Sequence, residues 1–406
     1  MLTQEANDRL TRIEPGTVMG GVMRRYWFPI CTVPELDEEP VRSVRVLGED
    51  LALFRSEDGA LGLVQERCPH RGASLVYGIP EEDGLRCCYH GWKYDRLGHC
   101  IEQPGEGNNN FKDKVCIQAY PVQELGGLIF AYLGPAPVPL LPRWDLLVRE
   151  DLEREIGVTV LPCNWLQTME NSVDPVHLEY LHGRYTNYRA KRRGEPPAAK
   201  VRHHEQIRFN VFEYGISKFR LLEGDSKDSD DWQIGHPVLF PNILAVGDSR
   251  TAEFQFRTPV DDTHTLYFWY WTRPRPVGAG PQDPHSIRVS ENPYRQENGT
   301  LVTDTINGQD MLAWVTQGAV ADRSNERLGT TDTGVILLRK VLEQQIERVE
   351  QGEDPLGIVR DPAKNTPMIE IPRERHAYYV VGNFVATEAG AVPLFQQGLP
   401  AGPLAG

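Results

Sequence analysis

Two short segments, each with one cysteine and one histidine, constrain the fold of this chain most. They read CPHRG and CCYHGW, and they supply Cys68, His70, Cys87 and His90. Each pair is short enough for one loop to present both side chains. A glycine follows each histidine closely and permits the tight turn that such a loop needs. The two segments therefore predict a metal centre held between two loops.

The order of these residues along the chain distinguishes two kinds of centre. Tetrahedral zinc accepts two cysteines and two histidines, and so does a Rieske [2Fe–2S] cluster. In a Rieske site each loop gives one cysteine and one histidine, so the two residue types alternate, as they do here. Classical zinc fingers separate the cysteine pair from the histidine pair. Zinc and four unrelated core residues remain alternatives, and the neighbouring Cys88 is expected to be a small buried side chain.

Composition excludes several classes of protein. The chain has 406 residues and a formal net charge of −14, which disfavours a nucleic-acid partner. No apolar run approaches the ~18–20 residues of a membrane span, so we expect no membrane partner. The N-terminus is charged and lacks the apolar region of a signal peptide, which favours a cytoplasmic protein. Seven cysteines, an odd number, favour metal ligation over disulfides.

The distribution of apolar residues predicts an α+β chain with an N-terminal all-β domain and a C-terminal antiparallel β-sheet backed by helices. We expect the domains at 20–135 and 136–385, with 1–19 packed on the second and a fraying tail at 386–406. The Pro-rich segment GPAPVPLLP marks the boundary between the two domains. The expected strands are 41–47, 51–55, 61–65, 207–219, 251–259 and 265–272, and the expected amphipathic helix is 334–352.

A second constellation lies in the segment NSVDPVHLEYLHG. Asp174 before a proline is typical of a helix N-cap, which places His177 in the first turn. His182 follows five positions later, ~140° away on a regular helix. A bulge or a helix end must therefore rotate His182, and Gly183 is a plausible helix stop. Two histidines and one carboxylate suit non-haem Fe(II), although spacing alone leaves a structural histidine pair open.

These motifs resemble those of one family. CPHRGASLVYG…CCYHGWKYD resembles the Rieske domain of bacterial ring-hydroxylating oxygenases, and NSVDPVHLEYLHG is similar to their mononuclear-iron motif. NGQDMLAWVTQGAVADRSNERLG resembles the phthalate-dioxygenase-like branch, which includes aromatic O-demethylases. The resemblance spans roughly residues 20–375. It implies a [2Fe–2S] cluster on Cys68, His70, Cys87 and His90, and Fe(II) on His177, His182 and Asp310.

The resemblance also implies an activity. The chain would be the terminal oxygenase of a multicomponent system, using O₂ on an aromatic and carboxylated compound. Asp174 would link His90 of one subunit to His177 of the next in a head-to-tail homotrimer. Because the sequence has no G-x-G-x-x-G after a predicted strand, a separate NAD(P)H-dependent reductase, with or without a ferredoxin, is expected. Ring hydroxylation and O-demethylation would use the same metal residues, so both stay open. An electron-transfer protein without catalysis is an alternative of another class.

Three further groups are candidates for the surroundings of the iron. The segment 184–200 has a net charge of +5, which suits either an anionic substrate, an acidic reductase or a solvated loop. Asn164 and Asn171 are candidates for its lining. The alternating aromatic residues are expected in the core rather than in a pocket, and they are Phe254, Phe256, Tyr267, Trp269 and Trp271.

Overall fold

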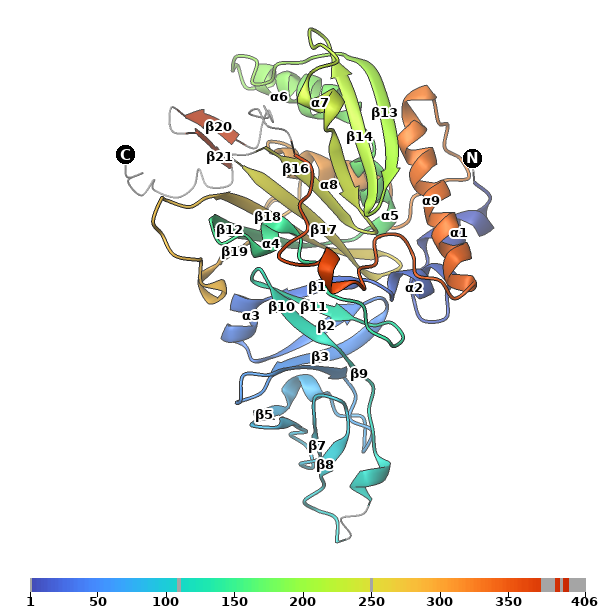
Figure 1. The fold of residues 1–406 in the computed structure, drawn as a ribbon, viewed down its shortest axis with the longest axis vertical. Helices are drawn as coiled ribbons and strands as arrows, with labels where there is room; N and C mark the ends of the chain where they lie inside the picture. Colours follow the sequence, from blue (N-terminus) through green and yellow to red (C-terminus); the bar gives the residue numbers. More distant parts are fainter. Residues whose placement is uncertain (1, 108–110, 249–250, 374–383, 388–389, 394–406) are drawn as a thin grey trace.

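The computed structural model describes residues 2–107, 111–248, 251–373, 384–387 and 390–393. The molecule is elongated, and three small sheets extend below one large sheet (Figure 1). The tip sheet contains β5 (Ile79–Glu81), β6 (Gly84–Arg86), β7 (Lys93–Tyr94) and β8 (Cys100–Glu102). The middle sheet contains β2 (Val41–Val46), β3 (Glu49–Arg55), β4 (Leu61–Gln65) and β9 (Ala119–Tyr120). The root sheet contains β1 (Trp27–Thr32), β11 (Leu128–Tyr132) and β10 (Val122–Leu125).

The β2–β3 hairpin joins the middle sheet to the large sheet. Its turn is formed by Leu47 and Gly48, with φ of 50° and 79°, which is the primed geometry that suits the twist of a hairpin. Their amides donate hydrogen bonds to the carbonyls of Pro259 and Val260. The predicted strands 41–47, 51–55 and 61–65 are confirmed as β2, β3 and β4, although β3 begins two residues earlier.

The large sheet has eight strands and is antiparallel except for its last strand, β19, which runs parallel to β12. The predicted strand over 207–219 is wrong, because residues between Phe212 and Gly215 turn the chain and make it a hairpin. In order across the sheet the strands are β13 (His204–Phe212), β14 (Gly215–Leu222), β15 (His236–Leu239), β16 (Ile243–Gly247), β17 (Ala252–Asp261), β18 (His264–Pro274), β12 (Leu152–Leu161) and β19 (Arg288–Glu291).

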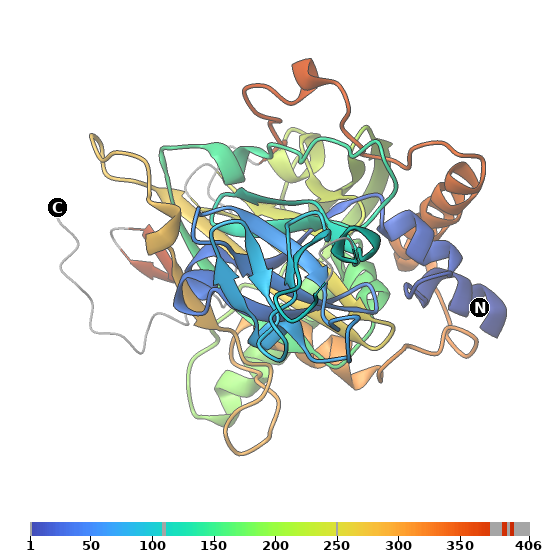
Figure 2. The ribbon, with the colours of Figure 1, turned by 90° about the horizontal axis from the view of Figure 1, so that it is seen from below.

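Helices cover one face of the large sheet, and the root sheet packs against the other. Arg257 contacts Met169 on the helical side, whereas Phe256 packs against Phe130 of the root sheet at 6.0 Å between ring centroids. Seen from below, the small sheets lie in front of the large one (Figure 2). The principal helices are α1 (Gln4–Thr11), α2 (Val18–Met23), α5 (Trp165–Ser172), α8 (Ile306–Thr316) and α9 (Thr333–Glu350).

Helix α9 confirms the expected amphipathic helix at 334–352. Its apolar face is buried in a core shared with α2, α5 and the root sheet. The expected aromatic core is also confirmed, because all five alternating aromatic side chains are buried. The shorter helical segments are α3 (Val33–Glu38), η1 (Leu75–Tyr77), η2 (Lys112–Lys114), α4 (Asp145–Val148), α7 (Asp230–Gln233), η4 (Pro284–Ser286), η5 (Thr330–Asp332) and η6 (Pro362–Lys364).

A buried ionic cluster ties α5 to α9. Glu170 accepts hydrogen bonds from Arg323 at 2.8 and 2.7 Å and from Arg339 at 2.7 Å. Arg323 also donates to Asn7 of α1 at 3.0 Å. Because all four side chains are buried, this cluster fixes the N-terminal helix on the helical side of the large sheet.

The two expected domains share this continuous core, and their boundaries at 20–135 and 136–385 stay a prediction. Residues 1–19 include α1, whose Arg9 pairs with Glu343 of α9 at 3.0 Å. The tail was expected to fray, but β20 (Phe384–Thr387) pairs with β21 (Gly390–Pro393), and residues 394–406 lie outside the described residues. Among the helices of the described ranges, none is both long and apolar enough to cross a membrane.

Candidate metal centres

Two loops of the same construction lie at the tip. In each, the glycine amide donates to the carbonyl of the cysteine four residues before it, at 2.8 Å in the first loop and 3.0 Å in the second. The cysteine amide donates in turn to the residue after the glycine, at 2.8 Å in both. Gly72 and Gly91 have φ of 76° and 75°, a left-handed conformation that glycine adopts without strain. The matched turns present Cys68 and Cys87, both buried, beside each other.

The histidines of the two loops also meet. The rings of His70 and His90 lie 4.4 Å apart, and His70 stacks on Trp92 at 4.5 Å. Nδ1 of His70 is buried without a hydrogen-bond partner, which suits a nitrogen that bonds a metal. Trp92 is itself buried, so this stacked pair packs the loop against the core of the domain. The expectation for Cys88 is wrong, because it is exposed next to the buried Cys87.

Tyr94 is a residue at this site that the sequence reasoning missed. Its hydroxyl lies 3.3 Å from Sγ of Cys68, where it can donate a hydrogen bond to a thiolate. Burial raises the pKa of the Cys68 thiol, and this hydroxyl lowers it. Tyr94 lies in the short strand β7, directly after the second loop, and the sequence carries no local signal that pairs it with Cys68, 26 positions earlier.

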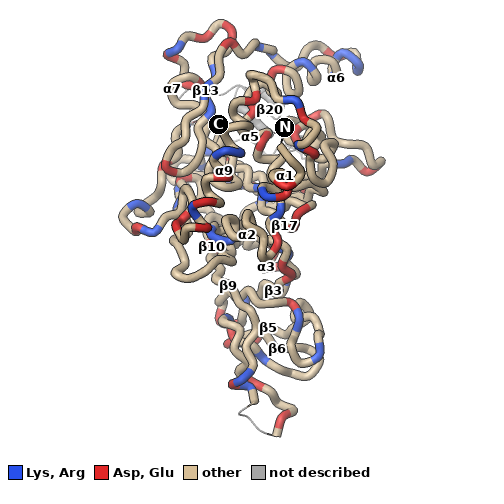
Figure 3. Tube along the Cα trace, turned by 90° about the vertical axis from the view of Figure 1, so that its right-hand side faces the viewer, with Lys and Arg blue, Asp and Glu red and all other residues tan. Residues whose placement is uncertain are grey.

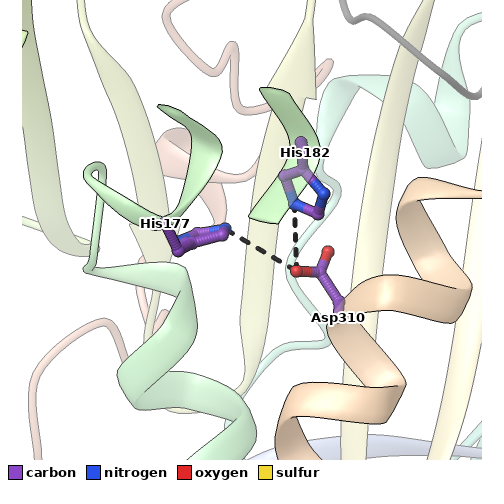
Figure 4. Close-up of side chains that lie close together, drawn as sticks. All are labelled: His177, His182 and Asp310. Carbon is purple, nitrogen blue, oxygen red and sulfur yellow. Dashed lines mark ion pairs between the residues drawn. The ribbon is translucent and has the colours of Figure 1, made fainter. Parts of the chain in front are cut away.

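The three side chains of the second constellation converge (Figure 4). Nε2 of His177 lies 3.6 Å, and Nε2 of His182 3.1 Å, from Oδ1 of Asp310. Among the residues that the structure describes, this is the one place where three candidate ligand atoms lie within 4.8 Å of one another. The tip residues therefore do not meet at one point, as tetrahedral zinc with bonds of ~2.0–2.3 Å requires.

A π-helix brings the two histidines together. η3 (Leu178–Tyr185) continues without a break into α6 (Thr186–Arg192). Because a π-helix bonds residue i to residue i+5, positions five apart come to lie about one turn apart. This is a form of the expected bulge. The expected helix stop at Gly183 is wrong: the helix runs through it, and a Cβ there would lie 3.1 Å from Val201.

Gln309 fixes the orientation of His182. Its Nε2 donates to the carbonyl of Thr303 and the hydroxyl of Thr186, both at 2.9 Å. Because a carbonyl can only accept, Oε1 of Gln309 must face Nδ1 of His182, 2.8 Å away. Nδ1 therefore carries the proton, and the lone pair of Nε2 points at Asp310. Sequence reasoning placed Gln309 beside the proposed ligand Asp310 but gave it no role.

The charges of the triad favour a bound cation. Burial raises the pKa of Asp310, but the imidazoles of His182 and His177 outweigh it, and the pKa lies below its ordinary value. Burial lowers the pKa of His182, whereas Asp310 and Gln309 raise it above its ordinary value. An ionised carboxylate between two imidazoles has the donor set that non-haem Fe(II) takes. The residues present thus fit the metal that the motif implies.

Asp174 lies between His177 and the surface. Its Oδ1 accepts the amide of Val176 at 2.9 Å, and its Oδ2 lies 3.6 Å from Nδ1 of His177. Burial raises the pKa of Asp174, but His177, the Val176 amide and Lys218 bring it below its ordinary value. The side chain of Asp174 keeps 29% of its surface exposed.

The remaining candidates differ in their placement. Asn171 donates to Oδ1 of Asp310 at 3.4 Å, whereas Asn164 caps α5 and donates to Thr11 and Asp262. The basic segment 184–200 includes α6, on which Lys and Arg gather (Figure 3). Three of its arginines are paired: Arg184 with Glu179, Arg189 with Asp304, and Arg193 with Glu195 and Asp304.

Comparisons with known proteins agree with this geometry. Residues 26–121 match the Rieske [2Fe-2S] domain, and residues 282–371 match a domain described as LigXa C-terminal domain like. The chain resembles the terminal oxygenase of carbazole 1,9a-dioxygenase from Novosphingobium sp. KA1, with a TM-score of 0.60 and 22% identity. That match covers 84% of this chain and 98% of the other. It shows the fold, and the α+β expectation is confirmed.

Two curated relatives are more similar in sequence. The chain is 42% identical to the 5,5'-dehydrodivanillate O-demethylase oxygenase subunit of Sphingobium sp. (strain NBRC 103272 / SYK-6), over 90% of this chain and 85% of the relative. It is 32% identical to the phthalate 4,5-dioxygenase oxygenase subunit of Pseudomonas putida, over 88% and 89%. Both are oxygenase subunits, which disfavours a carrier without catalysis. The chain thus belongs to the Rieske non-haem iron oxygenases, as the terminal oxygenase (alpha) component of a multicomponent system in the branch of phthalate dioxygenase and the aromatic O-demethylases.

Proposed function

We propose that this oxygenase demethylates a methoxylated aromatic acid by oxidising its methyl group. The observation that carries the proposal is the convergence of His177, His182 and Asp310, whose candidate ligand atoms lie within 4.8 Å of one another. The 42% identity to an O-demethylase subunit favours demethylation. Ring hydroxylation is the second candidate, supported by the 32% identity to a phthalate dioxygenase subunit.

We assign the metal ligands as the sequence predicts. Cys68, Cys87, His70 and His90 would hold the [2Fe–2S] cluster, and the buried, unpartnered Nδ1 of His70 supports this assignment. His177, His182 and Asp310 would hold Fe(II), which supplies O₂ activation when bound. The chain's own contribution is to orient: Gln309 holds the proton on Nδ1 of His182, and burial keeps water from Asp310.

The electron route would cross between two copies of the chain. The tip sheet lies at the lower end of the molecule, whereas α6 and α8 lie in the upper half, beyond the root sheet (Figure 1). A second copy that set its tip against Asp174 would bring its His90 to the carboxylate that faces His177. A carboxylate between two imidazoles fixes both rings and connects them. This arrangement supports a head-to-tail trimer, and electrons would come from a separate reductase or ferredoxin.

Product analysis tests the proposal. Purified protein loaded with cluster and iron would receive a surrogate reductase, NADH and a panel of carboxylated aromatics with and without methoxy groups. We expect formaldehyde in step with NADH consumption, and only from the methoxylated compounds. Hydroxylated rings without formaldehyde would contradict demethylation and identify the activity as ring hydroxylation. Peroxide without either product from every compound would contradict an aromatic-acid substrate.

A further inference from the structure

We propose that Lys218 is the anion anchor of the substrate site: its ammonium binds an anionic oxygen, carboxylate or phenolate, of the aromatic compound that reacts beside His177, His182 and Asp310. This inference rests on the proposed function, because it names the recognition of the same substrate. No sequence motif pointed to Lys218, which lies in the middle of β14.

The first support is a buried charge without a partner. Lys218 is 5% exposed, and within the described ranges no hydrogen bond or ion pair reaches its ammonium. A buried charge is costly unless something compensates it, so an unpaired lysine in a core needs an explanation. The nitrogen is not among the fully enclosed side-chain atoms, in contrast to Nε of Arg257. The ammonium therefore keeps some accessible surface, although the side chain as a whole is buried.

The second support is where β14 points this side chain. Lys218 lies two residues after Ile216, which packs in the core with α5 and α9, so both leave the sheet on its helical face. Asp310 extends from α8, which covers the same face. Lys218 and Asp310 thus extend into the same layer, between the sheet and its helices, and Asp310 acts electrostatically on the lysine.

The third support is electrostatic. Burial and, after it, the charge of Arg220 lower the pKa of Lys218, and although Asp174 and Asp310 raise it, the result is about 7. These two carboxylates are close enough to act on the lysine, but they make their ion pairs with His177 and His182 instead. An added anion would restore the charged form and compensate it at once. A neutral ligand would leave the lysine as it is.

Binding measurements separate this role from others. Calorimetry on the metal-loaded protein would use three probes: 3-methoxybenzoate, 4-nitrophenol, whose visible absorbance reports its ionisation, and uncharged 1,2-dimethoxybenzene. A hydrogen bond to a charged group contributes most in a buried site. We therefore expect Lys218→Met to lower the binding affinity for one or both anionic probes by about 10- to 100-fold. The neutral probe should change by less than about twofold. The probe that responds identifies the group as carboxylate or phenolate.

A matched control tests the competing basic segment. Lys191→Met removes an exposed cation from α6 and should leave all three affinities unchanged. Equal loss for all three probes in Lys218→Met, or no preference of the wild-type protein for anions, would overturn the proposal. The proposed function fails on a different readout, namely the absence of formaldehyde and hydroxylated product from a protein that still binds anions through Lys218.

Discussion

At the residue scale, the amide of Gln309 decides which nitrogen of His182 faces the carboxylate of Asp310. Replacing it with leucine, of similar size, removes both the acceptor for Nδ1 and the link to Thr303 and Thr186. The imidazole can then turn or change its tautomer, so we expect Gln309→Leu to weaken mononuclear iron by about 10- to 100-fold. Competition with an iron chelator measures this.

Two controls are needed to interpret the iron affinity of Gln309→Leu. Asp310→Ala removes a proposed ligand and should abolish both mononuclear iron and turnover, while the cluster keeps its absorbance. Cluster absorbance also serves as an internal check on the folding of Gln309→Leu. Wild-type iron affinity in Gln309→Leu would show that packing alone orients His182.

The site could be predicted only in part at this scale. His177 and His182 share a compact motif, and Asp310 was placed by its resemblance to a family pattern. Gln309, Tyr94 and Lys218 act through partners 127, 26 and more than 40 positions away, in contacts that no local spacing reveals. The expectation that Cys88 is buried was wrong because a loop can turn adjacent side chains to opposite sides.

At the element scale, one carboxylate holds α5, α9 and the segment between α8 and α9 together. Glu170→Gln keeps the shape but removes the charge that compensates Arg323, which is 1% exposed. We expect the free energy of unfolding to fall by about 3–5 kcal/mol, because a buried guanidinium is left without a counterion. Urea unfolding measures this. Glu195→Gln, at an exposed pair with Arg193, should cost no more than ~1 kcal/mol.

The packing of Gly334, near the start of α9, leads to a second prediction at this scale. A Cβ there would lie 2.2 Å from the carbonyl of Val173 and 2.6 Å from the ring of Phe209. Alanine normally stabilises a helix relative to glycine by roughly 0.5–1 kcal/mol. Here we expect Gly334→Ala to destabilise by about 1–3 kcal/mol, because the backbone next to Asp174 must move.

The helix α2 offers the matched comparison. Gly21 lies in this helix, and a Cβ there would meet nothing within 4 Å. Gly21→Ala should therefore be neutral or stabilising, and urea unfolding of both glycine variants measures the difference. If both substitutions stabilised the protein, the close approach of α9 to Val173 would have no energetic weight.

Elements were predictable where their patterns were local. The alternation of β2 and the apolar face of α9 follow from short-range periodicity. The predicted helix end at Gly183 was wrong because glycine also occurs where close packing leaves no room for a side chain, here against Val201. The π-helical turn follows from the requirement that two histidines five positions apart meet, a constraint that comes from the site rather than from helix propensity.

At the scale of the whole molecule, the tip and the triad of one chain lie far apart. Electron transfer between two chains can therefore be tested with two variants that each lack one centre. We would co-express Cys87→Ala, lacking a proposed cluster ligand, with Asp310→Ala, lacking a proposed iron ligand. Neither alone should turn over. With random assembly into rings, about one junction in four joins an intact tip to an intact triad, so we expect roughly a quarter of wild-type turnover.

Two observations keep this result interpretable. Size-exclusion chromatography must show the same assembly for both variants and for the mixture. Mixing the two variants after assembly should restore no activity. An inactive co-expressed mixture in intact rings would place the electron route within one chain and remove the role proposed for Asp174 between copies.

The position of the tip has a consequence for newly synthesised chains that have not yet assembled. On the proposed route, a newly synthesised chain with both centres loaded cannot reduce oxygen, because its own tip sheet lies at the lower end of the molecule, whereas α6 and α8 lie in the upper half. Oxygen consumption would begin only when chains have found one another. Dilution should then silence the enzyme more steeply than in proportion to its concentration, and stray chains would release no peroxide.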